Sequence, residues 1–334
     1  MKSVIRSERT RRTLGAVLRV LAVAAAYYAA GGLGLIRGVS VHGTAVTPLW
    51  PPTGIALGAL IHLGPAVWPG IALGSLCVVS TLSDSVSLLT VGVVAGCTLA
   101  PVCSFLMLRR AGFRQELDRL RDGVVLVFVG AMLGMTISAT IGTVMLLVDD
   151  HLPRTGFWPV WTAWWSGDVM GVLVVTPLLL VLRRARLPRA TDRWVEASAL
   201  AVAATAVSWV ATRSSLEMVY LVFPLLVWAA LSFRLAGSAP CAFLVSVMAA
   251  VAGAEGVGPF EGHSVLHVMV NLAVLNGSVA LTGLLLAALV TEQIDIRQRI
   301  ERACDELAEV VERLAPGGPT AAWPPRADDE AGGG

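Results

Sequence analysis

The sequence predicts an all-α protein, a polytopic integral membrane bundle of about ten transmembrane helices with both termini in the cytoplasm. Hydrophobic residues make up 56% of the 334 residues and charged residues only 14%, whereas about 25% of a soluble globular domain is charged. The apolar residues gather in blocks of roughly twenty, a length that crosses a bilayer as a helix. Arginines are concentrated in every second connection between these blocks, which is the pattern of a multi-span protein.

The apolar blocks are bounded by charged, proline or glycine residues. The first block is too long for a secretory signal and leads into further spans, so we expect it to be retained as a helix. The second and third blocks are short and contain three prolines. They are either two spans or one tilted or re-entrant hairpin, so the total is eight to ten spans. In order, the blocks are 14–36, 49–63, 67–82, 86–108, 123–148, 158–182, 194–212, 218–233, 237–254 and 265–290.

The connections between blocks predict the orientation. Arginines cluster at 109–121, at 183–193, at Arg234 and in the C-terminal tail, and cytoplasmic connections carry such an excess of basic residues. The opposite connections hold at most one arginine each and several acids, so we expect them outside. Glycines four residues apart predict close packing of helix backbones. These pairs are Gly54/Gly58, Gly70/Gly74, Gly92/Gly96, Gly130/Gly134 and Gly167/Gly171.

The two ends of the chain differ from the membrane part, residues 14–290. Residues 1–13 are basic and are expected in the cytoplasm. Residues 291–314 are highly charged, with apolar residues at alternating three- and four-residue spacings that predict a short coiled coil across a homodimer. The alternative is a lone amphipathic helix on the inner leaflet. Residues 315–334 are expected to be disordered. The predicted seam is Ile300, Ala303, Leu307, Val310 or Val311, and Leu314.

Asp168 is the most informative single residue. It lies about ten residues into its block, which places it roughly 15 Å below the outer surface and near the middle of the bilayer. A charge there is costly, so the carboxyl should face the bundle interior and be protonated, hydrated or hydrogen-bonded. Polar residues at a similar depth predict a polar layer around it: Asn276, Thr136, Ser138 and Thr140. Such a layer is either a ligand or proton site or a hydrogen-bonded structural knot.

Other chemistries are poorly supported. No two of the five cysteines are spaced as a C-x-x-C pair, so the sequence indicates neither a disulfide framework nor a zinc site. His263 and His267 are one helical turn apart, but no third metal ligand follows from the spacing. A G-x-S-x-G turn with a histidine at midplane depth, as an intramembrane serine protease would need, is absent. We therefore expect no enzyme activity, no cofactor, no metal and no nucleic-acid binding.

Several motifs, in order, resemble one family, the first type of the bacterial membrane-associated sensor (MASE) domains, over about residues 14–290. The resemblance implies an integral membrane sensory domain, usually upstream of a histidine kinase, diguanylate cyclase or phosphodiesterase. Its W-P-P-T-G and G-D motifs fall on residues 50–54 and on Gly167 and Asp168. The motifs are YAAGGLGL at 28–35, PLWPPTGIAL at 48–57, the segment 64–71, WWSGDVMGVLVVTP at 164–177, FPLLVWAA at 223–230 and GVGPF at 256–260.

The resemblance and the depth argument together suggest a ligand pocket. The W-P-P-T-G motif is expected to supply a helix break with free backbone groups near the membrane surface, and the G-D motif supplies the buried acid. We therefore expect a small ligand of unknown identity to bind at a site built from both motifs and their neighbours. The candidate binding residues are Trp50, Pro51, Pro52, Gly54, Trp164, Trp165, Asp168 and Asn276.

The expected function is that of a multi-pass sensor in the inner membrane. About 44 residues follow Val290, too few for a kinase or cyclase domain. The expected output is therefore a cytoplasmic signalling partner, a kinase or regulator, which receives the signal through the last helix. Two alternatives remain at this point. One is a small-solute transporter or channel with the same spans, although the break at residues 50–54 has no clear counterpart in the second half of the chain. The other is a scaffold protein.

Overall fold

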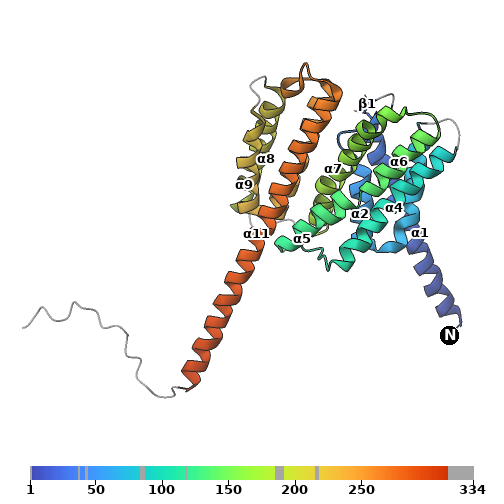
Figure 1. Cartoon of the computed structure of the whole chain (residues 1–334). Coiled ribbons are helices and arrows are strands. Elements are labelled where there is room, and N and C mark those ends of the chain that lie inside the picture. The colour runs from blue at the N-terminus through green and yellow to red at the C-terminus, as the bar shows by residue number, and fades with distance from the viewer. Residues whose placement is uncertain are drawn as a thin grey trace, which may run out of the picture. The chain divides into compact units, whose positions relative to one another are not determined.

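A computed structural model describes residues 2–36, 38–41, 44–82, 87–117, 119–184, 192–214 and 218–314 of the chain. The described part is a bundle of helices, as the composition predicts (Figure 1). A two-stranded antiparallel hairpin, β1 (Val39–Val41) and β2 (Thr44–Val46), follows the first helix, and Val39 pairs with Val46. The sequence analysis did not predict this hairpin.

The helices follow the predicted apolar blocks in order. A π-helical segment, Leu126–Leu133, joins α5 to α6, so one apolar block forms a single interrupted span. The helices are α1 (Lys2–Leu35), α2 (Pro51–Leu63), α3 (Trp68–Ser80), α4 (Leu88–Arg110), α5 (Leu120–Val125), α6 (Thr136–Val148), α7 (Phe157–Arg184), α8 (Asp192–Arg213), α9 (Val222–Phe233), α10 (Leu235–Glu255) and α11 (Val265–Leu314).

Seven helical segments in the described residues are long and apolar enough to cross a membrane. Three shorter apolar segments, Pro51–Leu63, Pro65–Ser80 and Met218–Phe233, account for the rest of the ten predicted blocks. At 1.5 Å per residue, a helix of 13 residues such as α2 rises only about 20 Å, less than the hydrocarbon core of about 30 Å. Whether the chain crosses the membrane seven or ten times therefore depends on these three short segments. The protein is a multi-pass membrane protein.

Helix α7 is the central element of the bundle. In the most apolar stretch of α7, 72% of the residues are buried, whereas 22% are buried in the corresponding stretch of α1. Side chains of α7 join those of α1 to α4 in one apolar cluster, which also includes Ala280 and Leu284 of α11. Helices α8 to α10 form a second cluster with Val279 of α11, and Figure 1 shows α8 and α9 beside α11. Helix α7 is therefore in contact with both groups of helices.

The glycine pairs lie where helix backbones meet, as predicted. A Cβ on Gly74 of α3 would lie 2.7 Å from Cβ of Tyr27 on α1, and one on Gly96 of α4 would lie 3.2 Å from Ile141 on α6. Real Cβ atoms rarely come so close to a neighbour, so larger side chains would push these helices apart. The stripes of small residues therefore fix the pairing of α3 with α1 and of α4 with α6.

Helix α11 extends through Leu314, but the chain divides into two compact units after Thr291. In the second unit, the helical residues 292–314 expose Ile300, Leu307 and Val310 of the predicted apolar seam. Arg297 and Glu301 form an ion pair of 3.1 Å beside it, at the i,i+4 spacing that supports a helix. The predicted disordered tail, 315–334, lies outside the described residues.

Candidate functional site

The W-P-P-T-G motif begins helix α2. Pro51 and Pro52 occupy the first helical positions, where a backbone N–H would lack an acceptor within the helix. The backbone groups of Trp50 are nevertheless in use. Its N–H donates to the carbonyl oxygen of Gly167 on α7 at 3.0 Å, and its carbonyl oxygen lies 2.8 Å from Thr53 Oγ1. The expectation of free backbone groups at this motif was therefore wrong.

The same motif packs directly on the G-D motif of α7. Thr53 Oγ1 also lies 3.1 Å from the carbonyl oxygen of Asp168, so its single proton is shared between two carbonyl groups. A Cβ on Gly171 would fall on the carbonyl oxygen of Trp50, and one on Gly54 would fall on the carbonyl oxygen of Gly171. Only glycine fits at either position. We call this backbone-to-backbone region the α2–α7 contact.

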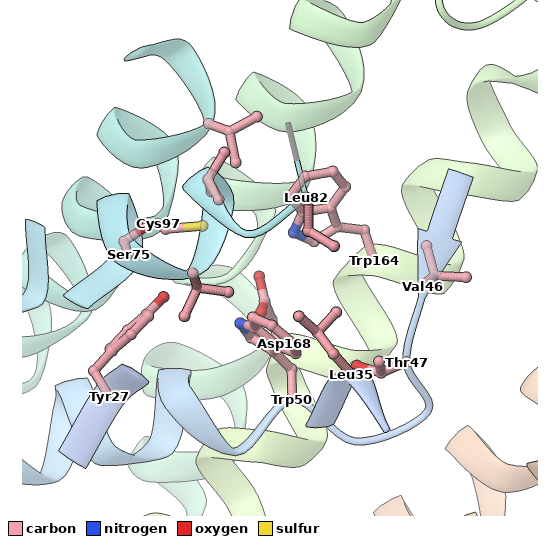
Figure 2. Close-up of a pocket in the computed structure, with 14 residues that line it drawn as sticks. Tyr27, Leu35, Val46, Thr47, Trp50, Ser75, Leu82, Cys97, Trp164 and Asp168 are labelled. Carbon is pink, nitrogen blue, oxygen red and sulfur yellow. The ribbon is translucent and has the colours of Figure 1, made fainter. Parts of the chain in front are cut away.

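A cavity of about 100 Å³ lies beside the α2–α7 contact (Figure 2). Its walls come from α1, α3, α4 and α7 and from the segment that joins the hairpin to α2. Leu35, Val46 and Leu82 are at the predicted outer ends of their elements, whereas Tyr27, Cys97 and Asp168 are deeper in theirs. The lining residues are Tyr27, Leu35, Val46, Thr47, Trp50, Ser75, Val78, Val79, Leu82, Val93, Cys97, Trp164, Gly167 and Asp168.

Asp168 is the only acid among the described residues that line this cavity. Its side chain is 1% exposed. The Ser138 hydroxyl is a hydrogen-bonding neighbour of the carboxyl. However, no hydrogen bond of ordinary length reaches either carboxyl oxygen within the described part of the chain. Leaving a buried polar group unpaired costs free energy. An unpartnered carboxyl on a cavity wall is therefore a candidate binding group.

Other polar groups gather around the carboxyl. Tyr27 and Cys97 interact electrostatically with Asp168, and Cys97 Sγ lies 4.0 Å from Ser138 Oγ. Ser75 and Trp50 are hydrogen-bonding neighbours of the Tyr27 hydroxyl, although no hydrogen bond of ordinary length reaches it within the described residues. Figure 2 shows this hydroxyl and the Cys97 sulfur pointing toward the space beside the Asp168 carboxyl. The deep end of the cavity is therefore polar, and its outer part is apolar.

The predicted site residues divide between this cavity and other places. Trp50, Trp164 and Asp168 line it. Pro51, Pro52 and Gly54 shape α2 without lining the cavity, and Gly54 belongs to the α2–α7 contact. The Trp165 indole instead donates to the carbonyl oxygen of Met132 at 2.9 Å, in the π-helical segment.

The predicted polar layer around Asp168 forms only in part. Asn276 is fully buried on α11, and neither of its side-chain polar atoms has a described partner. A Cβ on its neighbour Gly277 would lie 3.7 Å from Cε of Met170 on α7, so Asn276 lies near the depth of Asp168 but does not line the cavity. Of the residues on α6, Ser138 reaches the site, and Thr140 accepts a hydrogen bond from Trp161.

Among the cavity residues that the sequence analysis did not place at the site, three lie in its helices and could contribute polar groups: Tyr27, Ser75 and Cys97. Counting depth along their blocks places each of them within about ten residues of the predicted outer end, as it does Asp168. Depth alone does not say which side of a helix faces a partner, so these residues could not be separated from others at the same level. The described residues contain no group of three His, Cys, Asp or Glu side chains that could hold a metal ion.

The family model MASE1, membrane-associated sensor domain 1, matches residues 18–294. This match covers all of the cavity residues and both motifs of the α2–α7 contact. Searches of curated proteins and of solved structures gave no match.

Proposed function

Since the chain belongs to the MASE1 family of membrane-associated sensory domains, which typically occur in signalling proteins, we propose that it senses a small ligand held beside Asp168. One observation carries the proposal. The cavity contains a fully buried carboxyl, and no hydrogen bond of ordinary length reaches either of its oxygens within the described residues. A ligand that pairs with these oxygens would recover the free energy that their burial costs. The proposed activity is binding, with no catalysis.

Helix α7 offers the route by which occupancy changes the rest of the bundle. One side of α7 carries Asp168 and the α2–α7 contact. Another side packs against α10 and α11, where Leu173, Val174 and Pro177 meet Ala280 and Leu284 around a small second cavity. The contact with α11 lies about two helical turns beyond Asp168, toward the predicted cytoplasmic side. A displacement of α7 at the ligand would therefore also displace α11. Packed helices transmit such shifts because their side chains interlock.

Residues 292–314 are the proposed output. Their exposed apolar seam favours a parallel two-helix coil between two copies of the chain, for which the membrane raises the local concentration. A cytoplasmic kinase or regulator would read the state of this coil. The inner membrane of a bacterium is the proposed location, because the arginine-rich connections and the family both suit it.

The route can be tested without knowing the ligand, because Cys97 lines the cavity. A protein with Cys97 as its only cysteine is placed in lipid nanodiscs and treated with methyl methanethiosulfonate, which adds a thiomethyl group inside the cavity. Hydrogen–deuterium exchange over residues 292–314 is then compared before and after treatment. We expect the exchange rates of this segment to change once Cys97 is modified.

A matched control carries Cys103 as its only cysteine. Cys103 is on the same helix, α4, but does not line the cavity, so its modification should leave residues 292–314 unchanged. Complete modification of Cys97 with no change in exchange would contradict the proposed route. An equal change in the two proteins would show that the effect does not come from the cavity.

A further inference from the structure

We infer that the cavity beside Asp168 binds a small ammonium cation, an amine of the size of methylammonium to trimethylammonium. The inference rests on the proposed function, since it names the ligand class of the same site. Three observations support this ligand class: the carboxyl, the aromatic walls of the cavity and the cavity volume.

The first argument is charge. None of the described residues that line the cavity is lysine, arginine or histidine, so the lining supplies no positive partner for the carboxyl of Asp168. A buried charge is tolerated when a counter-charge and hydrogen bonds accompany it. An ammonium group brings both, because it carries a positive charge and at least one N–H that can donate to the carboxyl: trimethylammonium has one such N–H and methylammonium has three.

The second argument is the aromatic lining. Trp50, Trp164 and Tyr27 line the same cavity as the carboxyl, and Figure 2 shows the two indoles on different sides of it. Aromatic faces attract cations, tryptophan most strongly, and sets of such rings are a known means of holding methylated ammonium groups. The Tyr27 hydroxyl, which has Ser75 and Trp50 as neighbours, can accept a hydrogen bond from an N–H of a cation such as methylammonium.

The third argument is size and the choice of donor groups. A cavity of about 150 Å³ is known to hold benzene, so about 100 Å³ suits a ligand of on the order of four or five non-hydrogen atoms. A bare calcium ion would need about six to eight oxygen ligands. The valine and leucine side chains that make up much of the lining cannot supply them. An organic cation fits both the apolar walls and the single acid.

The test uses the unaltered protein in nanodiscs. Thermal unfolding is followed with trimethylammonium chloride up to about 100 mM, a concentration that stabilises through binding even when the affinity is low. We expect the unfolding midpoint to rise in a saturable manner. Sodium chloride at equal concentration controls for ionic strength, and tert-butanol is the neutral molecule of matching shape. Stabilisation by tert-butanol equal to that by the cation, or no stabilisation by methylammonium or trimethylammonium, would overturn the inference.

A second measurement locates the site. Trimethylammonium should slow the modification of Cys97 by 2-aminoethyl methanethiosulfonate, and it should have no effect on Cys103. In Asp168→Asn the affinity for trimethylammonium should fall by at least about tenfold, since a hydrogen-bonded charge pair is lost. If this variant does not fold, the measurements on the unaltered protein still decide the question. Protection of Cys103 equal to that of Cys97 would place the cation elsewhere.

The two proposals fail in different ways. Saturable, Asp168-dependent binding of the cation without any change in hydrogen exchange over residues 292–314 would remove the sensor route and leave the ligand class standing. A change in exchange on thiomethylation of Cys97, together with no preference for cations, would leave the sensor and remove the ligand class.

Discussion

Replacing Gly171 by alanine tests the α2–α7 contact most directly. The added Cβ would overlap the carbonyl oxygen of Trp50 and crowd the hydroxyl of Thr53. A carbon and an oxygen atom normally stay at least about 3.3 Å apart, so the two helices must separate by on the order of 1 Å. Overpacking of this kind costs about 1 to 3 kcal/mol. The hydrogen bond between Trp50 N–H and the Gly167 carbonyl oxygen lies in the same contact and would be stretched. We expect a total loss of about 3 kcal/mol of stability.

The matched control is Gly32→Ala. Gly32 lies on the exposed face of α1, and a Cβ there meets nothing within 4 Å. Alanine is the better helix former, so this variant should be as stable as the parent or slightly more so. Unfolding in detergent can be followed with a thiol-reactive dye in a background whose only cysteine is Cys241, because this side chain is buried in the folded protein. If Gly171→Ala and Gly32→Ala unfold at the same temperature, the α2–α7 contact is not as tight as the structure indicates.

Three further predictions concern the site, the orientation and the output helix. Asp168→Asn should keep the protein folded, with a change in stability of less than about 1 kcal/mol, because the amide matches the carboxyl in shape; aggregation of this variant on size-exclusion chromatography would favour a structural hydrogen-bond knot. A cysteine at Thr155 should react with an impermeant reagent in intact cells and one at Gln115 should not, because arginines cluster around residue 115; the reverse result would invert the orientation. In a background without Cys304, a cysteine at Leu307 should crosslink two copies and one at Glu309 should not, because only Leu307 lies on the apolar seam; equal yields at both positions would argue against the coil.

Much of the fold follows from the sequence because a bilayer allows few ways to satisfy a backbone. An apolar block must form a helix to pair its own N–H and C=O groups, so each predicted block contains a helix in the structure. The glycine pairs likewise mark helix contacts, as Gly74 and Gly96 illustrate. The hairpin at Val39–Val46 was missed, because two strands of three residues leave too short an alternating pattern to be recognised.

The site was predictable only in part, and for a physical reason. The depth of Asp168 follows from counting residues along a helix, but the rotation of that helix does not. Asn276 has the same depth as Asp168 and is absent from the cavity lining, whereas Tyr27 and Cys97 line the cavity. Which helix faces which is decided by packing between residues far apart in the chain, such as Gly54 with Gly171. A single sequence contains no direct record of that pairing.

The joining of α2 to α7 restricts how a ligand can act. The two helices are linked near one end by Trp50 and Gly167, and further along by the Thr176 hydroxyl, which donates to the Gly54 carbonyl oxygen at 3.1 Å. Near the other end, Arg183 lies 3.3 Å from the carbonyl oxygen of His62. Glycine contacts leave no room for α2 to slide along α7. We therefore expect the pair to move as one body, so that the proposed cation beside Asp168 would change the distance between this pair and the opposite wall, which α1, α3 and α4 form. Since α7 also packs on Ala280 and Leu284 of α11, the proposed route to the output helix begins at this packing.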